Sequence, residues 1–145
     1  MEQIEFRIFK RSDFPVYQTW FSDPWLEAAL GPMDQEWLEH ILLDKTGAQY
    51  AIFQANEMVA VLGVVWAKGD AIYHTVSDLA IRPDRRRQGL GQKILDHLIH
   101  QVKVPKAKGW ITYVEPNNAK AIDFMKKCAW DLVEDASMYA FIRTH

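Results

Sequence analysis

The chain has 145 residues, of which 49% are hydrophobic and 25% are charged, and its formal net charge is −2. This length fits one domain of ordinary size, so we expect residues 1–145 to form a single domain. The composition excludes collagen-like and generally disordered chains, the near-neutral charge argues against a dedicated nucleic-acid-binding protein, and the single Cys cannot close an intramolecular disulfide.

The N-terminal segment carries no pattern typical of export or membrane insertion. Its residues 1–8 alternate polar and apolar side chains and lack the apolar core of a signal peptide. The longest mostly apolar run, residues 58–67, is much shorter than the ~20 residues that a membrane-spanning helix needs. We therefore expect a cytoplasmic protein that does not bind a membrane.

The first half of the chain predicts a strand, two helices and then three strands. Period-2 alternation predicts a strand over residues 4–8, and apolar residues at helical spacing predict a helix over residues 14–21. A second helix is expected to begin near Asp34 and to end before Gly47. Short, turn-rich connections join the strands that follow, and they predict an antiparallel meander over residues 50–54, 58–66 and 72–82.

The second half of the chain predicts alternating helices and strands. The expected elements are a helix over residues 90–102, a strand over 110–114, a helix over 118–128, and a final strand or hairpin over 132–143. A strand, a helix and a further strand in this order predict a parallel pair with a right-handed crossover. The predicted fold class is α/β (α+β), with one mixed, mostly antiparallel sheet flanked by helices.

The segment between residues 76 and 91 carries the clearest chemical signal. Its glycines, Gly89 and Gly91, let backbone N–H groups approach a ligand closely. The N-terminus of the following helix favours an anion, and four arginines add positive charge: Arg82, Arg85, Arg86 and Arg87. The pattern is equally compatible with a phosphate-binding loop and with a solvated basic loop. It is neither a Walker loop nor a dinucleotide fingerprint, because the third glycine of the latter is replaced by Ile94.

Three blocks of the sequence resemble the GNAT superfamily of acyl-CoA-dependent N-acetyltransferases. Arg86-Arg87-Gln88-Gly89-Leu90-Gly91 matches the family's Gln/Arg-x-x-Gly-x-Gly/Ala signature, and Leu79-Ala80-Ile81-Arg82-Pro83 is similar to its Leu-Ala-Val-x-Pro strand. Downstream, residues 118–124 resemble the family's Asn-x-x-Ala-Ile-x-Leu/Phe block. The order and spacing of the three blocks agree with the family over most of the chain from about residue 51 onward.

The resemblance implies that acetyl-CoA is the cosubstrate, with no metal. The pyrophosphate would lie on the N–H groups of Arg87, Gln88, Gly89, Leu90 and Gly91, with Arg86 nearby. The pantetheine arm would pair with the backbone of Leu79, Ala80 and Ile81, where a β-bulge in this family opens a gap and one N–H faces the thioester oxygen. Asn118 would hydrogen-bond the arm, cap the following helix, or do both.

A general base is needed because an amine with a pKa near ~10.4 is mostly protonated at neutral pH. Asp78, just before the cofactor strand, is the first candidate, at a position where many relatives carry an acidic residue. Its alternative is an exposed strand carboxylate or the partner of an Arg. His74 lies on the same face by even spacing and is the second candidate, although a lone His is more often structural. Glu115 is the third.

The general acid is the least defined part of the expected site. Many relatives use a Tyr on the last helix, and Met125 occupies the matching position here. Tyr139, Tyr113 or water is expected to replace it, or the thiolate leaves unassisted. Tyr113 also stands where the branch of the family that acetylates protein N-termini carries a Glu. This difference argues against acetylation of protein N-termini as the function. Cys128 is expected to be a small buried residue rather than a nucleophile.

The resemblance implies direct transfer of an acetyl group to a primary amine of a small molecule or peptide in a ternary complex. A non-catalytic acyl-CoA-binding or sensor module is the alternative. Binding of nucleic acid through residues 85–87 is a third reading, which the acidic balance of the chain disfavours. The histidines show no metal-binding spacing. Members of the family often form homodimers, so a homodimer is an expectation, whereas the amine acceptor is left open.

Overall fold

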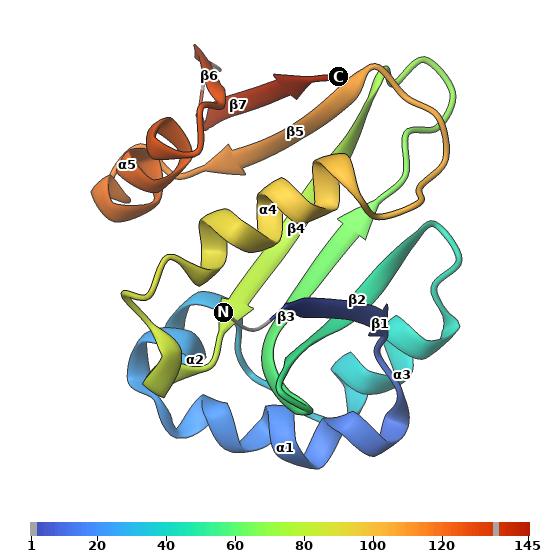
Figure 1. Ribbon diagram of the computed structural model, residues 1–145, viewed down its shortest axis with the longest axis vertical. Coiled ribbons are helices and arrows are strands. Elements are labelled where there is room, and N and C mark those ends of the chain that lie inside the picture. The colour runs from blue at the N-terminus through green and yellow to red at the C-terminus, as the bar shows by residue number, and fades with distance from the viewer. Residues whose placement is uncertain (1–2, 135–136) are drawn as a thin grey trace. The chain divides into compact units, whose positions relative to one another are not determined.

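The computed structural model describes residues 3–134 and 137–145. The strands of this part of the chain are β1 (Ile4–Ile8), β2 (Gly47–Gln54), β3 (Glu57–Val65), β4 (Tyr73–Ile81), β5 (Gly109–Val114), β6 (Asp131–Glu134) and β7 (Tyr139–Thr144) (Figure 1). The α-helices are α1 (Phe14–Thr19), α2 (Pro24–Leu30), α3 (Gln35–Leu43), α4 (Leu90–His100) and α5 (Ala119–Lys127). The strands form one sheet in the order β1-β2-β3-β4-β5-β7-β6. The predicted mixed, mostly antiparallel sheet with flanking helices is confirmed.

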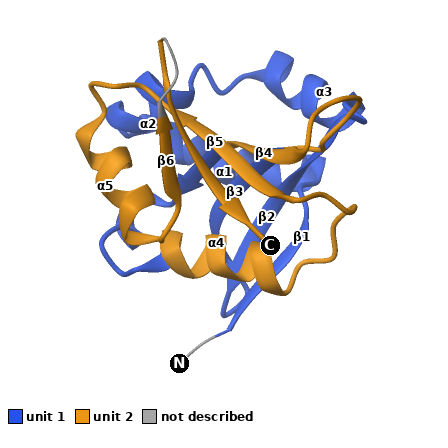
Figure 2. Ribbon diagram, turned by 90° about the horizontal axis from the view of Figure 1, so that it is seen from above, with its two compact units in different colours: residues 1–64, 78–90 blue, residues 65–77, 91–145 orange. Residues whose placement is uncertain are grey.

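The chain comprises two compact units (Figure 2). The first contains residues 1–64 and 78–90, and the second contains residues 65–77 and 91–145. The boundary crosses β4, so each unit takes part of this strand. That the whole chain forms a single domain stays a prediction.

β1 pairs antiparallel with β2, a pairing that was not part of the prediction. In the β1–β2 pair, Ile4 lies opposite Gln54 and Ile8 opposite Tyr50. The turn from β2 to β3 has positive φ at two successive residues, 52° at Ala55 and 66° at Asn56. Two positive φ angles in a two-residue loop are typical of the hairpin turn whose twist matches that of the flanking strands.

The helices of the first unit differ from the prediction in two ways. The helix expected over residues 14–21 ends at Thr19, and residues 20–22 form a 3₁₀ helix. The unpredicted α2 begins directly after Asp23, whose Oδ2 accepts from the Leu26 N–H at 3.0 Å. Pro24 is then the first helical residue, where its missing N–H costs nothing. The helix expected to begin near Asp34 and to end before Gly47 is confirmed as α3, and Gly47 is the first residue of β2.

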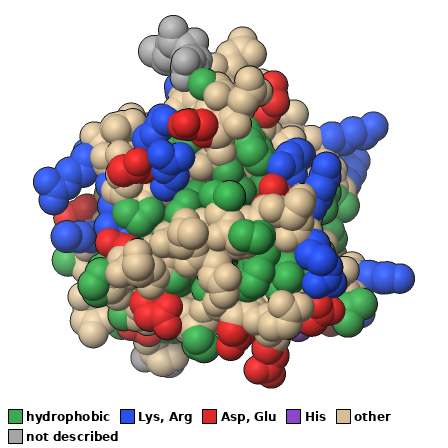
Figure 3. Space-filling model, turned by 90° about the horizontal axis from the view of Figure 1, so that it is seen from below, with side chains coloured by type: hydrophobic (Ala, Val, Ile, Leu, Met, Phe, Trp, Pro, Cys, Tyr) green, Lys and Arg blue, Asp and Glu red, His purple; other side chains and the backbone are tan. Residues whose placement is uncertain are grey.

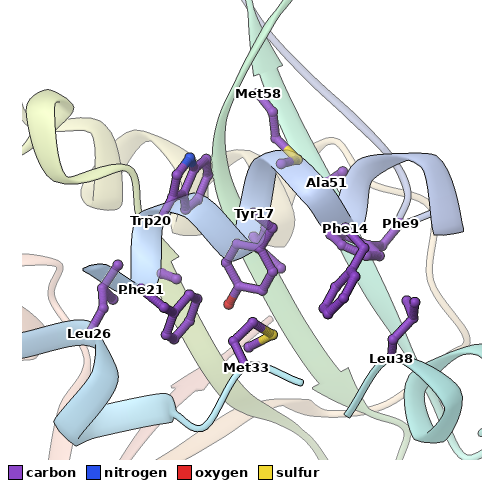
Figure 4. Close-up of a cluster of buried hydrophobic side chains, with 12 residues drawn as sticks. Phe9, Phe14, Tyr17, Trp20, Phe21, Leu26, Met33, Leu38, Ala51 and Met58 are labelled. Atoms are coloured by element: carbon purple, nitrogen blue, oxygen red, sulfur yellow. The ribbon is translucent and has the colours of Figure 1, made fainter. Parts of the chain in front are cut away.

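An aromatic cluster forms the core of the first unit (Figure 4). Tyr17 of α1 stands at its centre with 1% of its surface exposed. Its ring makes edge contacts with Phe9, Trp20 and Phe21 at centroid distances of 5.7, 5.2 and 5.1 Å. Such edge-to-face pairs stabilise a core beyond the area that they bury. The cluster fixes α1 and the 3₁₀ turn that leads into α2.

The second unit contains the predicted parallel pair and a closing hairpin. Residues 73–75 of β4 pair in parallel with residues 109–111 of β5, and α4 lies between these strands in the sequence. β5 then pairs antiparallel with β7, and β6 pairs antiparallel with β7. The final element is therefore a hairpin, although residues 135–136 of its connection lie outside the described residues. The position of β7 between β5 and β6 was not part of the prediction.

No helix in the described part of the chain combines the length and the apolar character needed to cross a membrane.

Gly109 gives a test of the β5–β7 pairing. A Cβ at this residue would collide with the carbonyl oxygen of Arg143 and would lie 2.8 Å from Cα of Thr144. Both obstacles are backbone atoms of a paired strand and have little freedom to move. We expect Gly109→Ala to lower the free energy of unfolding by about 3 kcal/mol, measured by urea denaturation.

Gly69→Ala is the matched control for this test. No atom lies within 4 Å of a Cβ at Gly69, whose φ is +63°. That substitution should cost roughly 1–2 kcal/mol, which is the strain of a left-handed residue. A Gly109→Ala protein as stable as the wild type would contradict the described register of β5 and β7.

Candidate active site

The loop between β4 and α4 has an unusual backbone. A 3₁₀ turn, Pro83–Arg85, follows β4. The φ angle is then +65° at Arg87 and +72° at Gly89, directly before α4. Positive φ is costly for most residues and free of cost for Gly. A Cβ at Gly89 would meet no atom within 4 Å, so the space beside this residue is open.

The N-terminus of α4 differs from those of three other helices. Side-chain oxygens of Asp23, Asp34 and Asn118 accept N–H groups of the first turns of α2, α3 and α5, respectively. The residue before α4 is Gly89, which has no side chain with which to do so. The first N–H groups of a helix have no partner within the helix and carry partial positive charge. This end of α4 therefore suits an anion such as a phosphate.

The arginines of the loop are largely paired with carboxylates. Arg82 contacts both oxygens of Asp84 at 2.7 and 2.9 Å, and it lies 3.6 Å from Glu57. Arg85 contacts Glu57 at 2.7 Å. Arg87 is the one arginine of the four for which the described residues include no carboxylate within 4 Å. The positive charge predicted for this loop is thus mostly compensated within the chain.

Arg86 joins the loop to the beginning of α2. Its Nη2 donates to Oδ2 of Asp23 at 2.7 Å, and its Nη1 donates to Oδ1 at 3.2 Å. The guanidinium carbon also lies 5.3 Å from the centre of the Trp25 ring. The hydrogen bond from Arg86, followed by that from the Leu26 N–H, holds the pKa of Asp23 below its usual value. Asp23 therefore caps a helix and binds the loop with the same carboxylate.

A cleft of about 460 Å³ lies beside this ion pair. The face of the molecule in Figure 3 shows exposed apolar side chains among charged groups of both signs. The volume falls within the usual range of ~300–1,000 Å³ for small-molecule sites. The cleft is lined by Thr19, Trp20, Ser22, Asp23, Pro24, Arg82, Pro83 and Asp84.

His74 is buried with both ring nitrogens engaged. Its exposed fraction is 1%. Nδ1 accepts from the Ala67 N–H at 2.8 Å, and Nε2 lies 2.7 Å from the Pro105 carbonyl oxygen. These partners assign the proton to Nε2. The rings of Trp66 and Trp110 lie 5.1 and 5.0 Å away. This environment fits a structural histidine, and a role as base stays a prediction.

Asp78 is partly exposed and is held by a residue that the sequence did not indicate. Its Oδ2 accepts from Nε2 of Gln49 in β2 at 2.9 Å. The pKa of Tyr17 is raised, first by burial and then by the negative charge of Asp78. The Gln49 side chain thus orients the carboxylate of Asp78, and the negative charge of that carboxylate acts on Tyr17 in the aromatic core. No local pattern around Gln49 could have indicated this contact.

The parallel pairing of β4 with β5 is short. It covers residues 73–75. The next carbonyl, that of Val76, accepts from the side-chain hydroxyl of Thr112 at 2.9 Å, while β4 itself continues to Ile81. The predicted cofactor residues, Leu79, Ala80 and Ile81, lie in this continuation.

The remaining candidates occupy the second unit. Asn118 accepts from the Ala121 N–H at 3.1 Å, so its predicted capping role is confirmed, and its contact with a cofactor stays a prediction. Tyr139 begins β7 and is partly buried, whereas Tyr113 is 48% exposed. Cys128 is buried, and burial raises the pKa of its thiol to about 11. The prediction of a small buried residue there is confirmed.

Among residues 3–134 and 137–145, no three or more His, Cys, Asp or Glu side chains form a group that could hold a metal ion.

The family model described as the Acetyltransferase (GNAT) family matches residues 14–130. The chain therefore belongs to this family of acetyltransferases. No protein with a curated function matches the chain in sequence.

Solved structures show the same fold. An acetyltransferase from Thermus thermophilus is similar over 100% of both chains, with a TM-score of 0.83 and 20% identity. The match to the aminoglycoside acetyltransferase AAC(6')-Ib, in complex with coenzyme A, covers 99% of this chain and 95% of the other chain, with a TM-score of 0.80 and 15% identity. A Salmonella typhimurium acetyltransferase that modifies the N-terminal serine of ribosomal protein L7/L12 covers 98% and 95%, with a TM-score of 0.80 and 15% identity.

The two hydrogen bonds of His74 generate a test of its role. His74→Gln changes the geometry at both nitrogens, and each buried group left without a partner costs about 1–3 kcal/mol. We expect the free energy of unfolding to fall by about 2–4 kcal/mol, measured by urea denaturation, while acetyl transfer per folded molecule changes little. The exposed His100→Gln is the control. A His74→Gln protein of full stability that has lost acetyl transfer would instead identify His74 as the base.

Proposed function

We propose that the protein transfers an acetyl group from acetyl-CoA directly to a primary amine of a small molecule or peptide. The observation that carries this proposal is the N-terminus of α4, which begins after a glycine with φ of +72° and open space beside it. Backbone N–H donors in such a position recognise the oxygens of a phosphate. Membership in the acetyltransferase family supports an acyl-CoA as the source of that phosphate.

The donors of the loop fit the diphosphate of coenzyme A. The N–H groups of residues 87–91 would hold it, and the side chain of Arg87 would add a charge-assisted hydrogen bond. The bound thioester supplies an activated acetyl group. The backbone of Leu79, Ala80 and Ile81 would align the pantetheine arm as a strand does, and one of these N–H groups would stabilise negative charge on the acyl oxygen. The side-chain amide of Asn118 would donate to the arm while its oxygen caps α5.

Asp78 would act as the general base. The acceptor amine reaches the enzyme mostly protonated, and Asp78 would take its proton directly or through one water. The nitrogen–carbon bond to the acetyl group would then form, the carbon–sulfur bond would break, and the nitrogen would lose its second proton to water. Tyr139, or water, would supply a proton to the departing sulfur. His74 is not assigned a step in this proposal, because a backbone N–H already occupies its acceptor nitrogen.

Cofactor binding tests the loop. Gly89→Glu places a carboxylate at the anion-binding end of α4 and adds left-handed strain. We expect at least about tenfold weaker binding of coenzyme A, measured by isothermal titration calorimetry. Gly69→Glu is the matched control, because Gly69 also has a positive φ and open surroundings but lies in the turn before β4. Wild-type protein that shows no heat with millimolar coenzyme A would contradict the proposal, and so would equal binding by the two variants.

Asp78→Asn tests the base. Removal of a general base is expected to lower kcat by about 10²–10⁴-fold, while the affinity for coenzyme A stays unchanged. The residual rate should rise with pH in proportion to the free amine, because no enzyme group then removes the proton. The measurement is thiol release from acetyl-CoA over a panel of amines and pH values. Glu115→Gln is the control, and a fall in kcat there instead of at Asp78 would reassign the base.

A further inference from the structure

The guanidinium of Arg86 already binds an anion of the chain itself. Both terminal nitrogens donate to the carboxylate of Asp23, at 2.7 and 3.2 Å. A phosphate presents to a guanidinium the same pair of acceptor oxygens as a carboxylate does. The edge of the guanidinium formed by Nη1 and Nη2 therefore cannot make this two-point contact with Asp23 and with a phosphate at the same time.

Asp23 is held firmly in this position. Its Oδ2 accepts both from Arg86 and from the N–H of Leu26 in the first turn of α2. Pro24, directly after it, fixes the direction in which α2 leaves. With 21% of its side chain exposed, Asp23 is also less accessible to water than the carboxylates that pair with the other loop arginines. The fold therefore fixes Asp23 in the position where it contacts Arg86.

The ion pair also joins the two chain segments that line the cleft. Residues 19, 20 and 22–24 come from the first segment, and residues 82–84 come from the second. Arg86 lies two residues after the second segment, and Asp23 belongs to the first. Trp25 extends the same connection, because Arg86 lies over its ring.

We propose that Asp23 is an internal anionic ligand of Arg86 that a phosphate of the cofactor displaces. Asp23 thereby acts as a positioning residue: it holds the loop and α2 together before binding, and it weakens the affinity for the phosphate-bearing part of the cofactor. The inference rests on the proposed function, because it requires that coenzyme A binds this loop.

Asp23→Asn separates the charge of Asp23 from its capping role. Asn caps a helix as well as Asp does, so α2 keeps its first turn while Arg86 loses its anion. We expect coenzyme A to bind about two- to fivefold more tightly to this variant, as the loss of a partly exposed competing ion pair allows. The measurement is isothermal titration calorimetry at low ionic strength, where surface ion pairs are least screened.

Two controls test whether the change in affinity comes from the charge of Asp23 and acts on the phosphates of coenzyme A. Asp34→Asn removes the same charge from the residue that caps α3, and it should leave the affinity unchanged. Pantetheine lacks the phosphates, so its affinity should be the same in the wild type and in Asp23→Asn. A merely structural effect of the substitution would change both ligands together.

A double-mutant cycle decides whether Arg86 is the partner. In an Arg86→Gln background no guanidinium remains to compete for, so adding Asp23→Asn should leave the affinity for coenzyme A unchanged. Unchanged or weaker binding by Asp23→Asn alone would overturn the inference, as would tightening that persists without Arg86 or that extends to pantetheine. If the wild type binds coenzyme A in a Gly89-dependent way, these outcomes leave the proposed function intact. If it does not bind, both proposals fail.

Discussion

The candidate site depends on the N-terminus of α4, where the residue before the helix is a glycine and has no side chain to cap it. At α2, α3 and α5 an Asp or Asn oxygen accepts an N–H group of the first turn. At α4 the preceding residue is Gly89, which offers only its backbone and an open approach. Unpaired N–H groups are costly when they are kept from water. A hydrogen-bond acceptor on a ligand would therefore bind favourably at this end of the helix. The phosphate acceptor that we propose for this position is that of coenzyme A, as membership in the acetyltransferase family supports.

The arginines beside this N-terminus contribute less positive charge than their number indicates. Arg82, Arg85 and Arg86 each contact a carboxylate of the chain, which leaves Arg87 as the loop cation without such a partner in the part of the chain that is described. The backbone therefore carries most of the proposed phosphate recognition. A loop whose charges are compensated in this way also attracts polyanions less at long range, which suits a binder of one diphosphate better than a binder of nucleic acid.

Local patterns predicted what local physics decides. Alternation of apolar residues located the strands, helical spacing located α4, and Asn118 was recognised as a cap because capping acts over three residues. The same logic applied to Asp23 and Pro24 would have found α2. The predicted helix ended at residue 21 and no helix was predicted directly after it, although Asp before Pro is a favourable helix start. The order of β5, β7 and β6 depends on pairing between distant segments, which periodicity does not encode.

The contacts that give the site its character join residues far apart in sequence. Arg86 and Asp23 are separated by 63 positions, and Gln49 and Asp78 by 29. Even spacing predicts one face of β4 for His74 and Asp78, yet it does not distinguish their surroundings. Two Trp rings and two backbone groups enclose His74, whereas Asp78 is partly exposed and accepts from a side-chain amide. The two candidates therefore differ in burial: the imidazole satisfies backbone groups inside the second unit, and the partly exposed carboxylate is the one that we propose as the base.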